Sequence, residues 1–321
     1  MKLTLSRPEH AEVISEFYRN LHGSEFAHEE MFSASTVAQL LRDEELTVVV
    51  ASHQQKILGC GLAFLRPWNQ SLEIGALSVV DDIPDRGEVG KALFEALRRL
   101  GMKNHGVVFF RARSESSFKR GRSIGASCWG FRPAPGSESV EDAELIMGFY
   151  NAAGQSQRVE PPRNIVTELP FAARVIEGIE AGEKGIPYPK SFPVGCPRGT
   201  GAVVISGRIW PTYHSRGNYI NIENAAGNYP IEIIREFTTT VRTKGVRDVR
   251  LTLPVNQDEA FIELVDFGFQ PVAYLPGWFL RGPHRFDCVE LVTAVPRVPH
   301  VAASFLSKAV GKINEGFAIQ V

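Results

Sequence analysis

The stretch DRGEVGKALFEAL, residues 85–97, places two glycines, an arginine and a lysine immediately before a helical pattern. The first N–H groups of a helix have no intrahelical partner, and the aligned peptide dipoles add partial positive charge there. Glycine keeps that backbone uncovered, whereas a side chain would hold an anion at a distance. The stretch therefore predicts an anion site at the start of a helix.

The same stretch excludes one common kind of phosphate site. A nucleotide-binding P-loop needs a serine or threonine after its lysine to bind Mg²⁺, but Lys91 is followed by Ala92. No Ser–His–Asp or Cys–His constellation is evident, so we expect no covalent intermediate on the protein. The cysteines form no C-x-x-C pair, and we expect buried thiols and no metal. They are Cys60, Cys128, Cys196 and Cys288.

The elements that must position this site follow from periodicity. A stripe of Leu93, Phe94, Leu97 and Leu100 predicts a helix over about 90–103, and the apolar run before it predicts a strand over 72–80. The other predicted elements of this half are strands at 3–6, 46–51, 56–65 and 107–112, helices at 10–21 and 117–128, and a final strand pair through GFRPA and AELIMGFY.

Length and charge set the frame for these elements. A chain of 321 residues suits two domains, and 35 basic against 36 acidic residues leave no net field for nucleic acid or a membrane surface. We expect partners of neither kind. The first residues lack an apolar signal core, and no apolar run is long enough to cross a bilayer, so we expect a cytoplasmic protein.

A polar, proline-containing stretch at 151–163 predicts a linker between an N-terminal domain at 1–150 and a C-terminal domain at 164–321. The second half repeats the order of the first. The Gly130-Phe131 and Gly268-Phe269 pairs are separated by the same offset as Gly90 and Asn228, where the two long helices are expected to begin. The shared offset predicts an internal duplication.

The order of elements around DRGEVGKALFEAL resembles that of the GNAT acyl-CoA N-acyltransferases, whose signature is a Gln/Arg-x-x-Gly-x-Gly/Ala turn before a helix. The resemblance covers most of 1–150 and, more faintly, 164–295. It implies an α/β fold of two tandem GNAT-like domains, each with a mixed central sheet flanked by helices. In the second copy the corresponding turn, NAAGN at 224–228, is too short to surround a pyrophosphate.

The resemblance implies acetyl-CoA, or another acyl-CoA, as co-substrate. Arg86 would supply charge to its pyrophosphate, and the end of the preceding strand would pair with the pantetheine arm. The implied backbone donors are Gly87, Glu88, Val89, Gly90 and Lys91, and the implied strand residues are Ser78, Val79 and Val80. The loop is one residue shorter than usual, with Glu88 in place of a glycine, so we expect this carboxylate to point to solvent.

By the same resemblance, Glu73 is the candidate general base, acting directly or through water. The family's tyrosine acid is replaced here by Ala126. Its neighbour Ser127 is the candidate acid, with Cys128 or water as alternatives. His28, Glu29 and Glu30 either recognise a cationic amine or form a solvated helix end.

These observations favour an acyl-CoA-dependent N-acyltransferase that transfers the acyl group directly to a small-molecule or protein amine. The alternative is a non-catalytic ligand-binding or regulatory protein on the same fold, since the tyrosine is missing and the loop is short. A homodimer is left open.

Overall fold

The computed structural model describes residues 1–23, 26, 28–54, 56–134, 139–161, 169–182, 211–214, 218–222, 231–294 and 304–317. The chain forms two compact units, Met1–Phe110 and Arg111–Val321. Their boundary falls within strand β5 (Val107–Ala112), ahead of the predicted linker at 151–163. The elements form mixed sheets with helices, so the predicted α/β class is confirmed.

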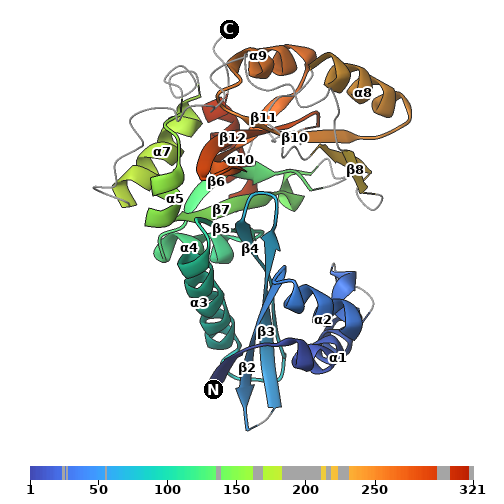
Figure 1. Ribbon diagram of the computed structural model, residues 1–321, viewed down its shortest axis with the longest axis vertical. Helices are drawn as coiled ribbons and strands as arrows, with labels where there is room; N and C mark the ends of the chain where they lie inside the picture. The colour runs from blue at the N-terminus through green and yellow to red at the C-terminus, as the bar shows by residue number, and fades with distance from the viewer. Residues whose placement is uncertain are drawn as a thin grey trace. The chain divides into compact units, whose positions relative to one another are not determined.

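Unit 1 is built on a sheet in the order β1-β2-β3-β4-β5, in which only the β4–β5 pair is parallel. The strands other than β5 are β1 (Lys2–Leu5), β2 (Leu46–His53), β3 (Lys56–Arg66) and β4 (Ser71–Val79). The helices are η1 (Pro8–His10), α1 (Ala11–His22), η2 (Glu29–Phe32), α2 (Ala34–Arg42) and α3 (Arg86–Asn104). Figure 1 shows α3 on one side of this sheet and α1 and α2 on the other.

Two glycines of β3 let α3 lie close to the sheet. A Cβ at Gly61 would lie 2.9 Å from Leu97, and one at Gly59 would lie 3.2 Å from Leu93. The apolar stripe of α3 therefore packs directly over β3. On the opposite face, α1 buries Ile14 and Tyr18 against Cys60 and Leu62 of β3.

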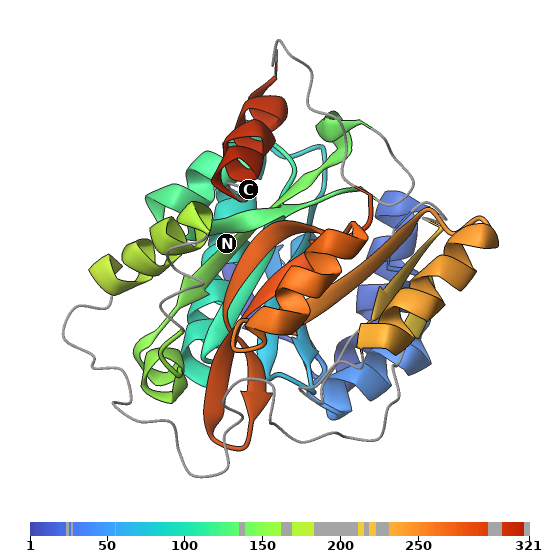
Figure 2. The same ribbon diagram turned by 90° about the horizontal axis from the view of Figure 1, so that it is seen from above.

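Unit 2 carries a sheet in the order β7-β6-β11-β12-β10-β9-β8. Its strands are β6 (Ser127–Arg132), β7 (Glu144–Tyr150), β8 (Pro211–His214), β9 (Tyr219–Ile222), β10 (Asp248–Pro254), β11 (Gln270–Arg281) and β12 (His284–Val292). Its helices are α4 (Glu115–Ser123), η3 (Val140–Asp142), α5 (Ala152–Gln157), α7 (Pro170–Gly182), α8 (Ile231–Thr243), α9 (Asp258–Phe267) and α10 (Phe305–Phe317). Figure 2 shows α8 and α9 side by side.

A similar strand arrangement occurs in each unit. In unit 1, β3 and β4 are antiparallel, α3 follows, and β5 returns parallel to β4. In unit 2, β8 and β9 are antiparallel, α8 follows, and β10 returns parallel to β9. The hairpins β6–β7 and β11–β12 follow in turn.

The segment predicted as a linker is an integral part of unit 2. Residues Ala152–Gln157 form α5, and Arg158 is fully buried. Arg158 Nε donates to Asp287 at 2.7 Å, and the same carboxylate accepts from the Tyr274 hydroxyl and the Gly277 N–H. Polar composition suggested a solvated stretch, but the buried ion pair satisfies its charge.

The compact units also differ from the predicted sequence halves. Strand β6, from the first half, pairs with β11, from the second, at Gly130 and Ala273. A Cβ at Gly130 would lie 2.3 Å from the Cα of Ala273, so this contact requires glycine. The short turn expected at 224–228 lies outside the described residues.

Candidate functional site

Strand β4 diverges from β5 partway along its length. The parallel pairing joins Ser71–Ile74 to Val107–Phe110 and stops there, whereas β4 continues to Val79. A register shift in the β3–β4 ladder between Gly61 and Ala63 accompanies the divergence. Beyond Ile74, β4 therefore pairs with β3 alone in the described part of the chain, and one edge of the strand is open.

The open edge presents the backbone of Leu77 and Val79. The Val80 N–H donates to the Leu58 carbonyl at 3.0 Å, so Val80 and Ser78 direct their backbone groups toward β3. Alternation then directs the N–H and C=O of Leu77 and Val79 to the side that β5 has left. Of the three strand residues expected to pair with a ligand arm, only Val79 faces the open side, and Leu77 joins it.

A short loop, residues 80–85, joins this edge to helix α3. The helix begins at Arg86, four residues earlier than the periodicity predicted. The Glu88 and Val89 N–H groups donate to the Asp85 carbonyl at 3.0 and 3.1 Å, and Gly90 and Lys91 lie within the helical ladder. The N–H groups of Arg86 and Gly87 have no acceptor in the described part of the chain. Of the five backbone donors expected at residues 87–91, only the Gly87 N–H is therefore available to an anion, and the Arg86 N–H joins it.

Two glycines lie in the first turns of α3, of which Gly87 is exposed and Gly90 is buried. A Cβ at Gly87 would meet nothing within 4 Å, and one at Gly90 would meet only Val79, at 3.9 Å. Packing therefore requires neither glycine, although each lowers helix stability by roughly 0.5–1 kcal/mol relative to alanine. Bare backbone beside the open end of β4 is what a closely bound anion needs.

The charged side chains of this turn point outward. Arg86 contacts Asp81 at 2.6 Å, and Lys91 lies 3.7 Å from Glu88. The Glu88 side chain is 75% exposed. It therefore lies in solvent, as expected for a carboxylate next to an anion site.

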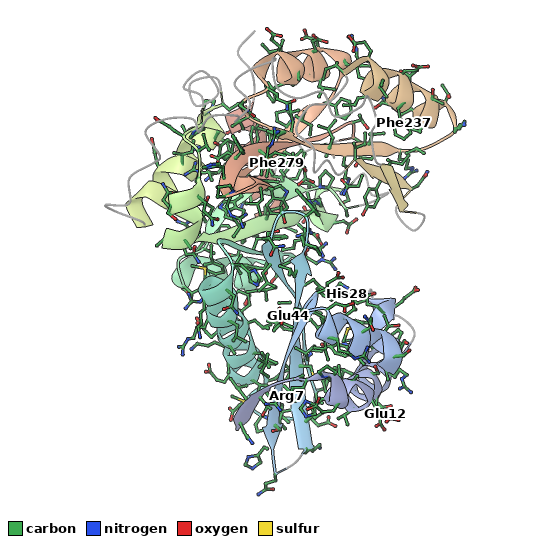
Figure 3. The ribbon with its side chains drawn as sticks, in the orientation of Figure 1. Arg7, Glu12, His28, Glu44, Phe237 and Phe279 are labelled. Atoms are coloured by element: carbon green, nitrogen blue, oxygen red, sulfur yellow. The ribbon has the colours of Figure 1, made fainter. Side chains whose placement is uncertain are left out.

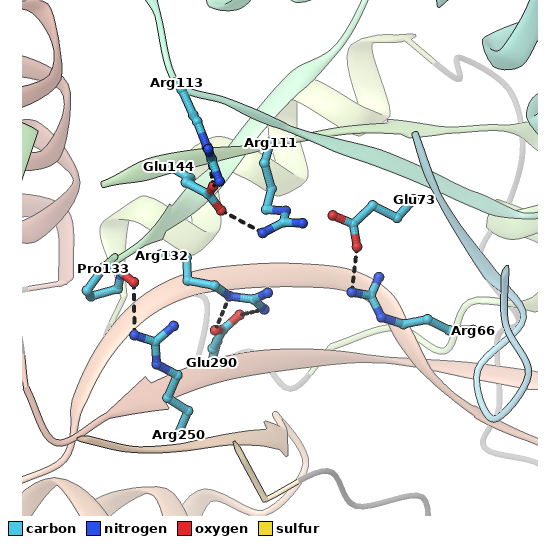
Figure 4. Close-up of polar contacts among 9 residues, drawn as sticks. All are labelled: Arg66, Glu73, Arg111, Arg113, Arg132, Pro133, Glu144, Arg250 and Glu290. Atoms are coloured by element: carbon cyan, nitrogen blue, oxygen red, sulfur yellow. Dashed lines mark hydrogen bonds and ion pairs between the residues drawn. The ribbon is translucent and has the colours of Figure 1, made fainter. Parts of the chain in front are cut away.

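The candidate base Glu73 is engaged in an ion pair. Its carboxylate accepts from Arg66 at 2.7 Å (Figure 4). The Arg66 guanidinium lies 4.6 Å from the centre of the Phe109 ring. Glu73 is 7% exposed. The Glu73 carboxylate is thus buried and already engaged by a guanidinium.

The candidate acid Ser127 begins β6 in unit 2, half-buried and opposite Gly148. Burial raises the pKa of the neighbouring Cys128 thiol to about 11, which makes it a poor donor to a thiolate. The role of Ser127 stays a prediction.

A pair that sequence reasoning missed lies on the α1 face of β4. His22, the last residue of α1, makes a hydrogen bond of 2.8 Å from Nε2 to the Ser78 hydroxyl. Ser78 is 5% exposed, and His22 is half-buried. Desolvation lowers the pKa of His22, opposed by the nearby Asp81 carboxylate. No local motif links two residues 56 positions apart, and only the fold brings them together.

An aromatic row continues from this pair over the same face. It consists of Tyr18, His22, Phe26, His28 and Phe64, with neighbouring ring centroids 4.6–5.5 Å apart after a first step of 5.9 Å. Figure 3 labels His28 on the α1–α2 side. His28 also contacts Glu30 at 3.1 Å, which lowers the pKa of that carboxyl group. Tyr18 and Phe26 belong to the buried core, so the half-buried members of the row are His22, His28 and Phe64.

Unit 2 contains several arginine–carboxylate pairs, and these are mutually satisfied (Figure 4). Arg132 donates two bonds of 2.8 Å to Glu290, and Arg111 donates to Glu144 at 2.9 Å. Arg250 bridges Asp248 and the Pro133 carbonyl. Pairing of this kind organises a sheet face and does not single out a reactive group.

Among the described residues, no cluster of His, Cys, Asp and Glu has the composition of a metal site. A search of the same residues for a helix sufficiently long and apolar to cross a membrane found none. Thiols of Cys60, Cys128 and Cys288 are free, and Cys196 lies outside the described part.

The sequence matches no family model and no curated protein. Solved structures do resemble it. The aminoglycoside 6'-N-acetyltransferase from Enterococcus faecium is 13% identical, with 47% of this chain and 97% of that chain covered and a TM-score of 0.37. The ribosomal-protein-alanine N-acetyltransferase from Brucella melitensis is 15% identical, with 47% and 100% covered and a TM-score of 0.38.

A putative acetyltransferase of the GNAT family from Desulfovibrio desulfuricans is 13% identical, with 46% of this chain and 99% of that chain covered and a TM-score of 0.34. The match thus covers nearly the whole length of each of these proteins but less than half of this chain. At such identities and scores the matches carry no argument about activity, and the proposal below rests on the geometry of β4 and α3.

Proposed function

We propose that the chain is an acyl-CoA-dependent N-acyltransferase whose coenzyme lies along the open edge of β4 and the first turn of α3. The observation that carries the proposal is that an open strand edge lies directly before a helix start. Among the described residues, nothing pairs with the strand edge at Leu77 and Val79, and the loop of residues 80–85 joins this edge to a helix start whose first N–H groups have no acceptor.

Acyl-CoA has matching chemistry at the corresponding places. Its arm contains amide groups, which can complete the ladder of an open strand edge, and its pyrophosphate suits a helix N-terminus. Each completed backbone hydrogen bond contributes about 0.5–1.5 kcal/mol. A simple phosphate or nucleotide would leave the strand edge unused.

The acceptor in this proposal is a small-molecule or peptide amine that approaches from the α1 face, where the aromatic row lies. We further infer that β8-β9-α8-β10 derives from a second copy of β3-β4-α3-β5. We assign it no coenzyme, because β9 is paired with β10 along its whole length.

A non-catalytic acyl-CoA-binding protein is the second candidate. It is favoured by the ion pair that neutralises Glu73, the residue expected to act as base. Both candidates bind coenzyme, and only the first turns it over.

Calorimetric titration of the purified chain with acetyl-CoA and with CoA tests the binding site. We expect a Kd in the micromolar range, which corresponds to about −8 kcal/mol. Release of CoA thiol is then measured with a polyamine, an arylalkylamine, an aminoglycoside and a peptide with a free N-terminus. Binding with thiol release supports the transferase, and binding alone supports the second candidate. Failure of both acetyl-CoA and CoA to bind the folded chain would contradict the proposal.

A further inference from the structure

The hydrogen bond between His22 and Ser78 lies next to the part of β4 that would hold the coenzyme arm. Side chains alternate along the strand. Leu77 and Val79 pack toward α3, near Gly61 and Gly59, and Ser78 lies on the α1 face. The Ser78 hydroxyl is thus flanked in sequence by the two residues whose backbone faces the open side.

We propose that Ser78 and His22 form the proton relay of the transfer reaction, with Ser78 touching the acceptor amine and His22 receiving its proton. The inference rests on the proposed function and adds the groups that carry its acid–base chemistry. It replaces Glu73, whose carboxylate is committed to Arg66.

The surroundings of His22 favour a neutral imidazole that can accept a proton. From α1, Tyr18 stacks on the ring at 5.9 Å, and Phe26 stacks on it at 4.6 Å. From the loop after β4, Asp81 raises the pKa of His22 by less than burial lowers it, and Asp81 is itself paired with Arg86. Beyond Phe26 lies His28, paired with Glu30.

Two other titratable groups lie behind the pair, and neither competes for the proton. Burial raises the pKa of the Tyr18 phenol and of the Cys60 thiol, which is opposite Ser78 in the β3–β4 ladder. Both stay protonated at neutral pH. The Tyr18 hydroxyl is buried beside Ser78, and the Tyr18 ring stacks on that of His22.

The step balances without any further reactant. The amine nitrogen attacks the thioester carbonyl carbon and forms the C–N bond. The C–S bond then breaks, and its electron pair leaves with sulfur as a thiolate. The surplus proton on nitrogen passes to the Ser78 oxygen while the Ser78 proton passes to His22 Nε2. Reverse transfer through Ser78 returns a proton to the thiolate, whose pKa is about 8.5 as a simple thiol, and releases CoA.

Three variants test the relay. His22→Gln and Ser78→Ala remove its two members, and His53→Gln changes an exposed histidine at the end of β2 as a control. Thiol release from acetyl-CoA is followed against pH with tyramine and with water alone as acceptor. We expect kcat to fall about 100-fold in both relay variants, with acetyl-CoA affinity unchanged. The fall in wild-type activity toward acid pH should disappear in His22→Gln and persist in His53→Gln.

A second readout does not depend on turnover. An NMR titration of the histidine rings should place the pKa of His22 below the ordinary value of about 6.5 in the free protein. A pKa at or above that value would contradict the inference. Circular dichroism identifies a variant that fails to fold. If one of the two relay variants does so, the activity of the other one tests the relay.

The outcomes separate the relay from the proposed function. If acetyl-CoA does not bind the wild-type chain, both fail. If it binds but neither water nor any of the four amines named above releases thiol, the relay fails and the chain is a binding protein. If thiol is released and His22→Gln keeps the wild-type rate and pH profile, only the relay fails.

Discussion

The arrangements β3-β4-α3-β5 and β8-β9-α8-β10 share strand directions and connections but differ in their parallel pair. In the second, all four residues of β9 (Tyr219–Ile222) pair with β10. In the first, β4 pairs with β5 only through Ile74 and continues to Val79 with no further partner on that side among the described residues. One parallel pair is closed along the described strand, and the other opens.

The difference shows that topology alone does not create a site. A β-strand, a helix and a parallel strand bury the same kind of core in both places. In the described part of the chain, the opened pair leaves backbone donors and acceptors for a ligand, and Gly87 leaves the adjoining helix start bare. The proposed function therefore depends on the divergence of two strands, and the predictions below aim at it.

The largest expected effect comes from placing a charge at the start of α3. Gly90→Asp should weaken acetyl-CoA binding at least about 100-fold, because two like charges about 4 Å apart repel by about 4 kcal/mol at an effective dielectric constant of 20. Calorimetry measures the change. Ile233→Asp, in the first turn of α8, is the matched control and should leave the affinity unchanged. Equal affinity in Gly90→Asp would move the phosphate site elsewhere.

The next effect compares proline in the two parallel pairs. Val79 and Ile220 are β-branched and equally buried, each 6% exposed. Ile220 lies between β8 and β10, so proline there breaks a ladder. Val79→Pro removes an N–H that faces the open side. In denaturant unfolding, the free energy of unfolding of Ile220→Pro should be lower than that of Val79→Pro by about 1–3 kcal/mol. Equal losses would mean that the Val79 N–H is already paired.

The smallest effects compare the two ends of α3. A Cβ at Gly101 would lie 2.8 Å from Leu72 and 2.9 Å from Val108, at the closed end of the β4–β5 pair. Gly101→Ala should therefore destabilise the fold by about 1–3 kcal/mol. Gly87→Ala, at the open end, should stabilise it by roughly 0.5–1 kcal/mol, since nothing opposes the gain in helix propensity. Thermal unfolding of both variants checks the signs, and a stabilised Gly101→Ala would contradict the close packing.

Much of unit 1 could be predicted from periodicity, because its signals are local. The leucine stripe of α3 and the apolar runs of β3 and β4 identify themselves within a few residues. The divergence of β4 from β5 could not be predicted, because it depends on where a distant strand stops pairing. Arg158 lies in the segment predicted as a linker, and its burial could not be predicted because only the fold places Asp287 beside it.

The candidate site divides in the same way. A local pattern predicts Arg86, Gly87 and Gly90, and the structure places all three in the first turns of α3, with Gly90 next to Val79. His22 and Ser78 meet only through packing of α1 on β4, so no spacing in the sequence could indicate them. Glu73 was expected as a base by resemblance, but its partner Arg66 could not be foreseen from the strand pattern.

Residue-resolved amide hydrogen exchange, measured with and without acetyl-CoA, tests the central claim most directly. The account predicts that the Leu77 and Val79 amides exchange rapidly in the free chain and become protected in the complex. The Val80 amide, already bonded to Leu58, should be slow in both states. The amides of Tyr219–Ile222 should not respond to the coenzyme. Unchanged exchange at Leu77 and Val79, under conditions where acetyl-CoA is bound, would contradict the account.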